Sequence, residues 1–578
     1  MNLATATLLT FMAFLLSILV EFGVLKYTLA NRIHFVYTIA VLVIVCFLSS
    51  IDISLFKAWG SKISRQAISY MRYPKEVLPT IFVANNLKYI AIGIAQFFAF
   101  YGFYKKCKIQ ILDRVETKGI FLKTMIVLVG FGLGIVIIRG GVKGEVLSRN
   151  NVFHSGKGLL NFTALNSLWN LLDLATAPAK LAENYRFMSA QEAKDWVEKM
   201  HTATKDTSVI ITNGSRINIL VIMLESFGSD VVESVDGEKG VTPNFSKLAK
   251  EGILFNHFYS TGNRTEQGLL AILSAIPSQP TKSMIHDFDK LNNLPNLFKT
   301  LGAENYQTSF YYGGHLSFDN MEAYLGSAGV KHLIGEADLN AHKRTKWGAY
   351  DADLFAFQLH ELQGTIQPFF SVLATLTSHE WFEAEVPQIF KKDADHVNDD
   401  YRNTIHYTDS CLYGYINALK KEKWYSNTLV FLVADHACKF PKYRNHYETE
   451  RHRIPMLITG GALKAEFRGT INPKVGSQVD IASTILNQMG IKTKDFPRSK
   501  NLMNPYEPIF AWYSFDHGFG IVTNKDTIVY DYNQNRMLKS SSHVSIYWLN
   551  TGKAYMQYNS DAANCSGQNK VFSKQYLH

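Results

Sequence analysis

The chain has 578 residues, of which 47% are hydrophobic and 19% charged, and its formal net charge is +10. A single hydrophobic core does not grow to this size, so we expect at least two structural units. Apolar residues crowd the first part of the chain and charged residues the rest, which indicates a membrane part and a water-soluble part. No aromatic-basic recognition motif accompanies the positive charge, so it suits an anionic membrane surface and not a nucleic acid. The five cysteines lack metal-type pair spacing, which excludes a cysteine-based zinc site.

Four apolar stretches are long enough to cross a bilayer, which requires about 20 helical residues. They run from Leu8 to Leu25, Phe35 to Phe56, Thr80 to Tyr104 and Gly119 to Ile138. The first stretch does not end in the small residues of a signal-peptide cleavage site, because Lys26 to Arg32 leads straight into the second. We therefore expect a transmembrane domain of about four or five helices over residues 1–138.

The distribution of positive charge predicts the orientation of this domain. A basic loop from Lys105 to Lys118 precedes the last stretch, and such loops stay in the cytoplasm. The part of the chain after Ile138 is then expected on the outer side of the membrane. The loop from Lys57 to Lys88 is also basic, and with four spans it would lie outside too. Either this loop is an interfacial helix on anionic headgroups, or the number of spans is not four.

The remaining sequence divides into three parts. Residues 139–216 are mixed in composition and are expected to form a connector, in which Ser189 and Glu192 make a capping box before a short helix. Residues 217–505 open with the apolar run Ile217 to Leu224, which is typical of a strand buried on both faces of a parallel sheet. Similar runs alternate with helical patterns, which predicts an α/β fold. Short alternating segments in residues 506–578 predict a small antiparallel β-rich subdomain.

Polar residues follow two of the expected strands directly. Glu225 comes after the run that ends at Leu224, and Asp435-His436 follows Leu429 to Val433 after a single alanine. Ligands collect at the carboxyl ends of strands in open α/β sheets, so these side chains could converge on one divalent cation. The alternative for each acidic residue is that it caps a helix.

A third polar signal is Thr265, which lies in the segment Gly262 to Gly268 just before the apolar run Leu269 to Ile276. This position is at or next to a helix N-terminus, where backbone amides and the helix dipole favour a phosphate group. The neighbouring Arg264 has a guanidinium group that can grip phosphate oxygens. The alternative is that Thr265 simply caps the helix.

Several short motifs occur in a fixed order along the chain. They are Val221 to Ser226, Arg264-Thr265, Trp347-Gly348 before Asp351 and Phe355, Thr377 to His379, and Val433 to His436. In this order they resemble the lipoteichoic acid synthase family of the sulfatase and alkaline phosphatase superfamily. The resemblance covers the chain from Ile217 to Gly490, and the multi-span anchor before it also matches. It implies a sulfatase-like catalytic domain at the bacterial cytoplasmic (inner) membrane, facing the periplasm or the exterior.

The resemblance also implies a role for each matching residue. Glu225, Thr265, Asp435 and His436 would bind one divalent metal, usually Mn²⁺ in that family, although Mg²⁺ also suits such ligands. Thr265 would be the nucleophile that takes a phospho-headgroup, phosphoglycerol or phosphoethanolamine, from a membrane phospholipid and passes it to an envelope glycan or lipid. The expected substrate contacts are Arg264, Asp319, Trp347, His379 and His452. For His452 the alternative is a solvated charged loop.

At two places the sequence differs from the family patterns, and these differences limit the reactions and substrates that we expect. Sulfatases need a Cys or Ser closely followed by Pro and Arg, and Thr265 to Gly268 offers neither, so sulfate ester hydrolysis is not expected. Lipoteichoic acid synthases carry a Trp and an Arg for glycerol phosphate where this chain reads Phe318 to Met321. The acidic Asp319 in this segment could instead favour an amine-bearing headgroup.

Two other functions fit the same residues. One is a membrane-anchored phosphodiesterase or phosphatase that uses the same metal and Thr265 with water as the acceptor. The other is a non-catalytic envelope scaffold, whose expected signature is a broken metal set, whereas all four candidate ligands are present here. The sequence leaves transfer versus hydrolysis and the oligomeric state open.

Overall fold

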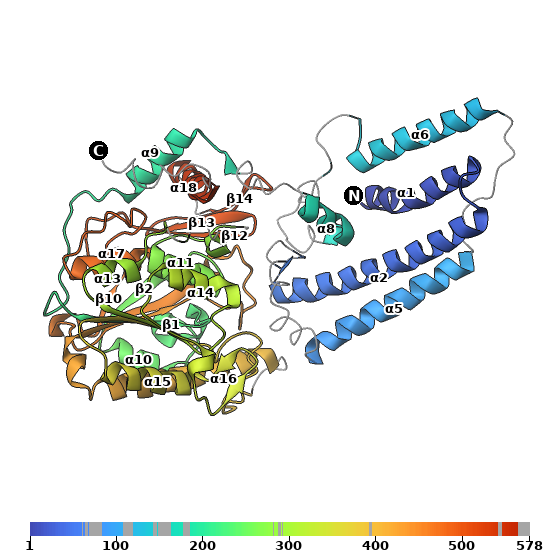
Figure 1. The fold of residues 1–578 in the computed structure, drawn as a ribbon. Coiled ribbons are helices and arrows are strands. Elements are labelled where there is room, and N and C mark those ends of the chain that lie inside the picture. The colour runs from blue at the N-terminus through green and yellow to red at the C-terminus, as the bar shows by residue number, and fades with distance from the viewer. Residues whose placement is uncertain are drawn as a thin grey trace. The chain divides into compact units, whose positions relative to one another are not determined.

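The computed structural model describes residues 1–59, 62–63, 67–68, 84–107, 119–142, 147, 163–176, 185–280, 283–286, 291, 293–391, 396–540 and 546–564. They belong to two compact units, Met1–Lys180 and Leu181–His578 (Figure 1). The segment expected to connect membrane and soluble parts is divided between these units. Helix α8 (Ser167–Thr176) belongs to the first unit and helix α9 (Ala190–His201) to the second. Helix α9 begins as expected, because the Ser189 side chain accepts a hydrogen bond from the Glu192 amide.

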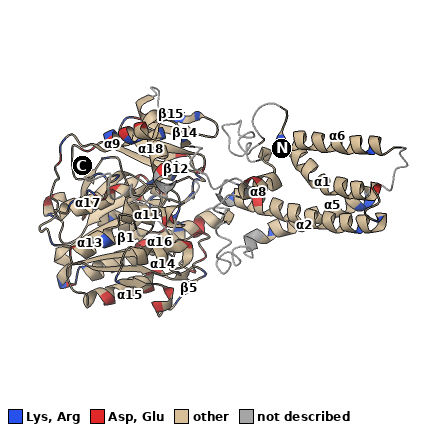
Figure 2. Cartoon of the chain, turned by 45° about the horizontal axis from the view of Figure 1, so that its top comes forward, with Lys and Arg blue, Asp and Glu red and all other residues tan. Residues whose placement is uncertain are grey.

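The first unit contains the four long apolar helices. Their bounds are Asn2–Glu21 for α1, Tyr27–Trp59 for α2, Ala84–Cys107 for α5 and Ile120–Arg139 for α6. All four are long and apolar enough to cross a membrane. In Figure 2 the ribbons of these helices are tan over most of their lengths, which marks residues other than Lys, Arg, Asp and Glu. The basic loop expected to set their orientation lies mostly outside the described residues, as does most of the segment 60–83.

Two acidic residues of the long helices, Glu21 and Asp52, lie close to lysine side chains. The Lys123 ammonium lies 2.5 Å from the Glu21 carboxylate, which joins α6 to the end of α1. Asp52 of α2 accepts a hydrogen bond from the Ile63 amide at 2.9 Å, and the Lys62 ammonium lies 3.8 Å from its other oxygen. Charges inside apolar helices are expensive unless they are paired, so these contacts explain how the helices carry them.

The second unit is built on a nine-stranded mixed sheet. Its strand order is β10-β2-β9-β8-β1-β7-β3-β4, with β11 also paired to β2, and β9 is antiparallel to both of its neighbours. The strands are β1 (Asn218–Leu224), β2 (Ile253–Tyr259), β3 (Gln307–Tyr312), β4 (His332–Ile334), β7 (Phe369–Ala374), β8 (Thr428–Ala434), β9 (Arg453–Thr459), β10 (Thr470–Asn472) and β11 (Gly476–Ser477). Every residue of β1, β7 and β8 is buried, which confirms the prediction from their unbroken apolar runs.

Helices cover both faces of this sheet (Figure 1). One layer contains α10 (Pro243–Ala249), α15 (Asp351–Gln363) and α16 (His396–Leu419), and the other contains α11 (Thr265–Ser274), α13 (Leu297–Ala303) and α17 (Ile481–Gln488). Helix α14 (Met321–Ser327) follows β3. The expected α/β architecture is therefore confirmed, and it brings the ends of β1, β8 and β2 to one edge of the sheet.

A four-stranded antiparallel sheet follows in the order β12-β13-β14-β15, as the alternating pattern predicted. Its strands are β12 (Phe510–Phe515), β13 (Gly518–Thr523), β14 (Thr527–Asp531) and β15 (Arg536–Ser540). The β-rich description of this region is incomplete, because a long helix, α18 (Ile546–Asn564), packs against α9 and this sheet. Tyr555 and Met556 of α18 share a buried cluster with Phe519 of β13. Tertiary packing of aromatic residues, not an obvious apolar periodicity, holds this helix in place.

A buried ion pair joins the two sheets. The Lys500 ammonium lies 2.9 Å from Oδ2 and 3.0 Å from Oδ1 of Asp480, just before α17, and also donates to the carbonyl oxygen of Phe510 in β12. Both charged side chains are at most 2% exposed. Removing one partner of such a pair leaves an uncompensated buried charge, which is the costly change.

We predict that Lys500→Met lowers the free energy of unfolding by about 3–5 kcal/mol, because Asp480 stays buried without its cation. Lys525→Met is the matched control, since Lys525 is exposed, and it should change stability by at most about 0.5 kcal/mol. Denaturant unfolding of the full-length protein, followed by tryptophan fluorescence, measures both. Equal stability of the two variants would contradict a structural role for the pair.

Candidate metal and phosphate site

Two carboxylates meet at the ends of neighbouring strands. Strands β1 and β8 are parallel and paired up to Leu224 and Ala434, their last residues. Glu225 and Asp435 therefore follow at the same level of the sheet, and both are buried, at 3% and 2% exposed. The amide of Ser226 donates to Asp435 Oδ1 at 2.9 Å, which ties the two strand ends together.

His436 completes this cluster. Its Nε2 lies 3.5 Å from Glu225 Oε1 and 3.5 Å from Asp435 Oδ2. Its Nδ1 donates to the carbonyl oxygen of Ala437 at 3.1 Å, so in the neutral ring Nε2 carries the lone pair and faces the two carboxylates. One ligand atom from each of the three residues lies within 4.8 Å of the others.

Thr265 is the first residue of α11 and points into the same cluster. Its Oγ1 donates to Glu225 Oε2 at 3.2 Å. The capping residue of α11 is Arg264, and no side-chain capping bond is present at that helix end. The alternative that Thr265 merely caps the helix therefore does not hold. The four residues expected to bind a metal are brought together, three of them from strand ends and one from a helix N-terminus.

The electrostatics of the cluster are those of a cation site. Burial and the Asp435 carboxylate raise the pKa of Glu225 well above its usual range. Burial lowers the pKa of His436, which favours the neutral ring that a metal requires. Two adjacent buried carboxylates cannot both ionise at low cost unless a positive charge lies between them.

The donor set fits a divalent metal. Asp435 Oδ2 is buried and has no hydrogen-bond partner among the described residues, although it faces the cluster. Three oxygen-bearing side chains and one imidazole make a predominantly hard ligand set, which suits Mn²⁺ or Mg²⁺ better than a thiolate-binding metal. The residues present therefore fit the expected ion.

Backbone contacts from distant elements hold the cluster in place. The Tyr401 hydroxyl of α16 donates to the carbonyl oxygen of Ser226 at 2.8 Å, and Ser378 Oγ donates to that of Glu225 at 2.7 Å. The Gln478 amide, 2.6 Å from the carbonyl oxygen of Asp435, fixes the end of β8. Tyr401 and Gln478 could not be predicted from the sequence, because they are far from the site along the chain and stand in no recognisable motif.

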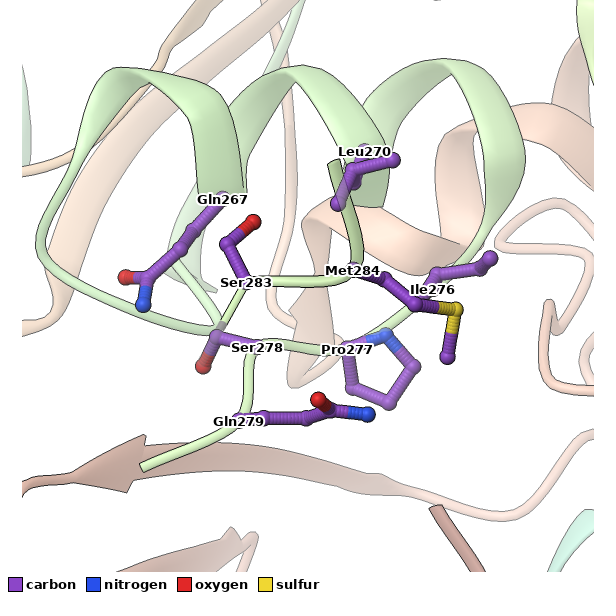
Figure 3. Close-up of a pocket in the computed structure, with 8 residues that line it drawn as sticks. All are labelled: Gln267, Leu270, Ile276, Pro277, Ser278, Gln279, Ser283 and Met284. Carbon is purple, nitrogen blue, oxygen red and sulfur yellow. The ribbon is translucent and has the colours of Figure 1, made fainter. Parts of the chain in front are cut away.

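Helix α11 approaches the end of β8 very closely. A Cβ atom at Gly268 would lie 2.3 Å from the carbonyl oxygen of Asp435, so only glycine fits there. One residue earlier, the Gln267 side chain accepts a hydrogen bond from the Asn263 amide and so shapes the loop before Thr265. Figure 3 shows Gln267 and Leu270 of α11 facing the segment Pro277 to Gln279 across a small hollow. None of the eight residues that line this hollow is titratable, so we regard it as support for α11.

His379 and Trp347 lie side by side. Their ring centroids are 4.1 Å apart, with 38° between the ring planes. The His379 Nδ1 donates to the carbonyl oxygen of Glu380 at 2.7 Å, and burial lowers the pKa of His379 to about 4. The ring is therefore neutral at pH 7, with Nε2 as a hydrogen-bond acceptor. Asp351 shapes the loop before it, because Asp351 Oδ1 accepts from the amides of Leu376 and Thr377.

Asp319 lies in a second acidic group beside the first. It is 4% exposed and has a left-handed backbone conformation, with φ of 47°. Burial raises the pKa of Glu266 to about 8, and the Asp319 carboxylate adds to this rise. The pKa of the Tyr312 hydroxyl is also raised, by burial and then by Glu225, Asp435 and Asp319, so this hydroxyl lies near both acidic groups.

His452 does not lie in a solvated loop. Its ring is 0% exposed, stacks on Tyr513 with centroids 4.0 Å apart, and donates through Nε2 to the carbonyl oxygen of His446 at 2.8 Å. The backbone carbonyl of His452 accepts from the Ser260 amide at 2.7 Å. These contacts give His452 a structural role beneath the loop that leads to Thr265, and they are not those of the expected substrate contact.

We predict that Gly268→Ala lowers the Mn²⁺ affinity by more than about tenfold, because the new methyl group must displace Asp435 or α11. Gly302→Ala is the matched control, since nothing lies within 4 Å of the added Cβ atom in α13, and it should leave Mn²⁺ affinity unchanged. Titration of metal-free protein, followed by the paramagnetic resonance of unbound Mn²⁺, measures both affinities. Unchanged affinity in Gly268→Ala would show that α11 does not position Asp435.

Residues 217–491 match the Sulfatase family. Lipoteichoic acid synthase-like YvgJ of Bacillus subtilis (strain 168) is 26% identical over 299 residues, which cover 48% of this chain and 48% of the relative. The chain spans about half the length of the curated relatives it matches.

Two crystal structures have a similar fold. A protein in the alkaline phosphatase superfamily from Vibrio parahaemolyticus has a TM-score of 0.58 and 25% identity, and the match covers 66% of this chain and 98% of that one. The lipoteichoic acid synthase LtaP from Listeria monocytogenes has a TM-score of 0.54 and 17% identity, with 65% and 99% covered. The chain therefore contains a sulfatase-like domain over residues 217–491, and it is similar to lipoteichoic acid synthases and to proteins of the alkaline phosphatase superfamily.

Proposed function

We propose that the protein transfers a phospho-headgroup from a membrane phospholipid, through a covalent intermediate on Thr265, to a glycan or lipid of the cell envelope. One observation carries this proposal. The Thr265 hydroxyl, at the start of a helix, is hydrogen-bonded to a buried carboxylate of a three-residue cluster with the composition of a metal site. A nucleophile, a cation site and a phosphate-favouring helix N-terminus therefore coincide.

Glu225, Thr265, Asp435 and His436 would hold one divalent metal, Mn²⁺ by preference, which lowers the pKa of the hydroxyl and offsets charge on the phosphate. In the first step the Thr265 oxygen bonds to phosphorus and the bond to the diacylglycerol oxygen breaks. The Thr265 hydroxyl gives up its proton as this bond forms, and the diacylglycerol oxygen takes the bonding electrons together with one proton, so no net proton is gained or lost. The headgroup stays on Thr265 as a phosphodiester.

His379 suits the second step. Its Nδ1 is committed to the carbonyl oxygen of Glu380, so Nε2 can accept the proton of an acceptor hydroxyl that attacks phosphorus. The new ester bond forms as the bond to Thr265 breaks, and the threonine oxygen is regenerated. Trp347, packed against His379, supplies a flat apolar wall for a headgroup or a sugar.

The names of relatives support phosphoglycerol as the transferred group. The acidic neighbours Asp319 and Glu266 favour an amine-bearing group, because an ammonium beside them would offset the repulsion by which Asp319 helps to raise the pKa of Glu266. Phosphatidylglycerol and phosphatidylethanolamine are therefore the two donors to compare. The four apolar helices would anchor the domain where such lipids are found, on the outer side of the cytoplasmic membrane.

We predict that full-length protein with Mn²⁺ and one of these two lipids releases diacylglycerol and gains a headgroup-phosphate adduct on Thr265. Thr265→Ala should give neither product, whereas Thr265→Ser should retain the adduct, because it keeps the hydroxyl. Mass spectrometry of the intact protein and of its peptides measures the adduct.

The same experiment separates transfer from hydrolysis. Adduct that persists until a sugar or lipid hydroxyl is added indicates a transferase, whereas rapid loss of adduct to water indicates a phosphodiesterase. Diacylglycerol release by Thr265→Ala at the native rate would contradict the proposed nucleophile.

A further inference from the structure

We propose that Arg451 is a second phosphate-binding residue, which faces the phosphoryl group together with Arg264 and binds its non-bridging oxygens. This inference rests on the proposed phosphoryl transfer, and it assigns a role to a residue that the motif comparison did not single out.

The sheet brings both arginines to the edge that carries the metal cluster. Strand β9 begins at Arg453, which is paired with Tyr259, the last residue of the antiparallel strand β2. The amino end of β9 therefore meets the carboxyl ends of β2 and β8. Arg451 lies just before β9, and Arg264 lies in the loop that follows β2. The hydrogen bond from the Ser260 amide to the His452 carbonyl oxygen, 2.7 Å long, holds these two segments together.

Arg451 is a buried cation with unused donors. The residue is 7% exposed, and neither Nε nor Nη1 has a hydrogen-bond partner among the described residues. Arg444 on the preceding loop shows the usual arrangement, because its guanidinium donates twice to Asp230, at 2.9 and 3.0 Å. A buried guanidinium without such a partner is costly, which indicates that its anion is a ligand and not a protein side chain.

The groups around Arg451 are those of the site. Burial raises the pKa of the Cys438 thiol and of the Tyr401 hydroxyl, and the Arg451 charge opposes both rises. Cys438 lies two residues beyond His436, and Tyr401 supports the backbone next to Glu225. Burial lowers the pKa of Arg451 itself, and its charged neighbours include Glu380, which follows His379. Residues from three separate segments of the site thus lie close to this guanidinium.

The charge balance of the site favours an anion between the two arginines. One divalent metal offsets Glu225 and Asp435, so neither carboxylate is left as a counter-ion for Arg451, whose Nε and Nη1 have no hydrogen-bond partner among the described residues. A phosphodiester brings one negative charge, and more charge accumulates on its non-bridging oxygens as a fifth bond to phosphorus forms. The guanidinium fork matches two such oxygens better than an ammonium does.

The test uses inorganic phosphate as the probe with full-length, Mn²⁺-loaded protein. Arg451→Met should weaken phosphate binding, measured as phosphate-dependent thermal stabilisation, by about tenfold to hundredfold. It should leave the melting temperature without phosphate unchanged or raised, because an uncompensated buried charge is removed. Arg451→Lys, which keeps the charge but not the fork, should give an intermediate affinity.

Arg444→Met is the matched control, since it removes a guanidinium that is already paired with Asp230. It should lower the melting temperature and leave phosphate affinity unchanged. If Arg451→Met instead lowers the melting temperature as Arg444→Met does and binds phosphate like the native protein, Arg451 is structural and the inference is wrong.

The kinetic result separates this inference from the proposed function. We expect a lower kcat for diacylglycerol release in Arg451→Met, because the contact strengthens as charge develops. Native adduct formation in Arg451→Met would overturn the inference but leave the Thr265 mechanism standing. Weakened phosphate binding in a protein that never forms an adduct would support the anion site and contradict the transferase.

Discussion

The site depends on two buried carboxylates, those of Glu225 and Asp435, which lie next to each other. Two negative charges held this close inside a protein cost free energy unless a cation balances them. They lie together because β1 and β8 are parallel and paired to their last residues. Neither side chain reaches solvent, and the Asp435 carboxylate adds to the burial that raises the pKa of Glu225. Without a cation, either at least one carboxylate is protonated or the repulsion between them lowers the free energy of unfolding. A divalent metal between the two carboxylates would relieve this repulsion, which is why the edge of the sheet is a candidate metal site.

The surrounding elements hold the Glu225 and Asp435 carboxylates in place, so that the two groups cannot move apart. Tyr401 and Ser378 hold the backbone after β1, and Gln478 holds the backbone after β8. Gly268 lets α11 come within contact of Asp435, so the helix N-terminus and its Thr265 hydroxyl are delivered to the carboxylates. The proposed nucleophile is therefore positioned by the backbone of the domain and by the first residue of a helix. Such placement contributes to catalysis by fixing the reacting atoms before the substrate binds.

The strands and the proximity of Glu225, Asp435 and His436 could be predicted where the signal is local. Unbroken apolar runs predicted β1, β7 and β8, and the residues that follow two of these strands predicted the cluster. Helix α18 could not be predicted from the sequence, because its aromatic residues are ordered by packing against α9 and β13. His452, in the segment before β9, was predicted to contact the substrate. In the structure its ring is buried and stacks on Tyr513. Whether a side chain in such a segment faces the site depends on long-range strand pairing, which a single sequence does not contain.

The most direct test of this account is anomalous X-ray diffraction at the manganese edge, from crystals of the full-length protein grown with Mn²⁺. The account predicts one strong peak bonded to Glu225, Thr265, Asp435 and His436, and its loss in Asp435→Asn. Manganese bound elsewhere in the protein, or a peak that persists unchanged in Asp435→Asn, would contradict the claim that the paired strand ends form the metal site.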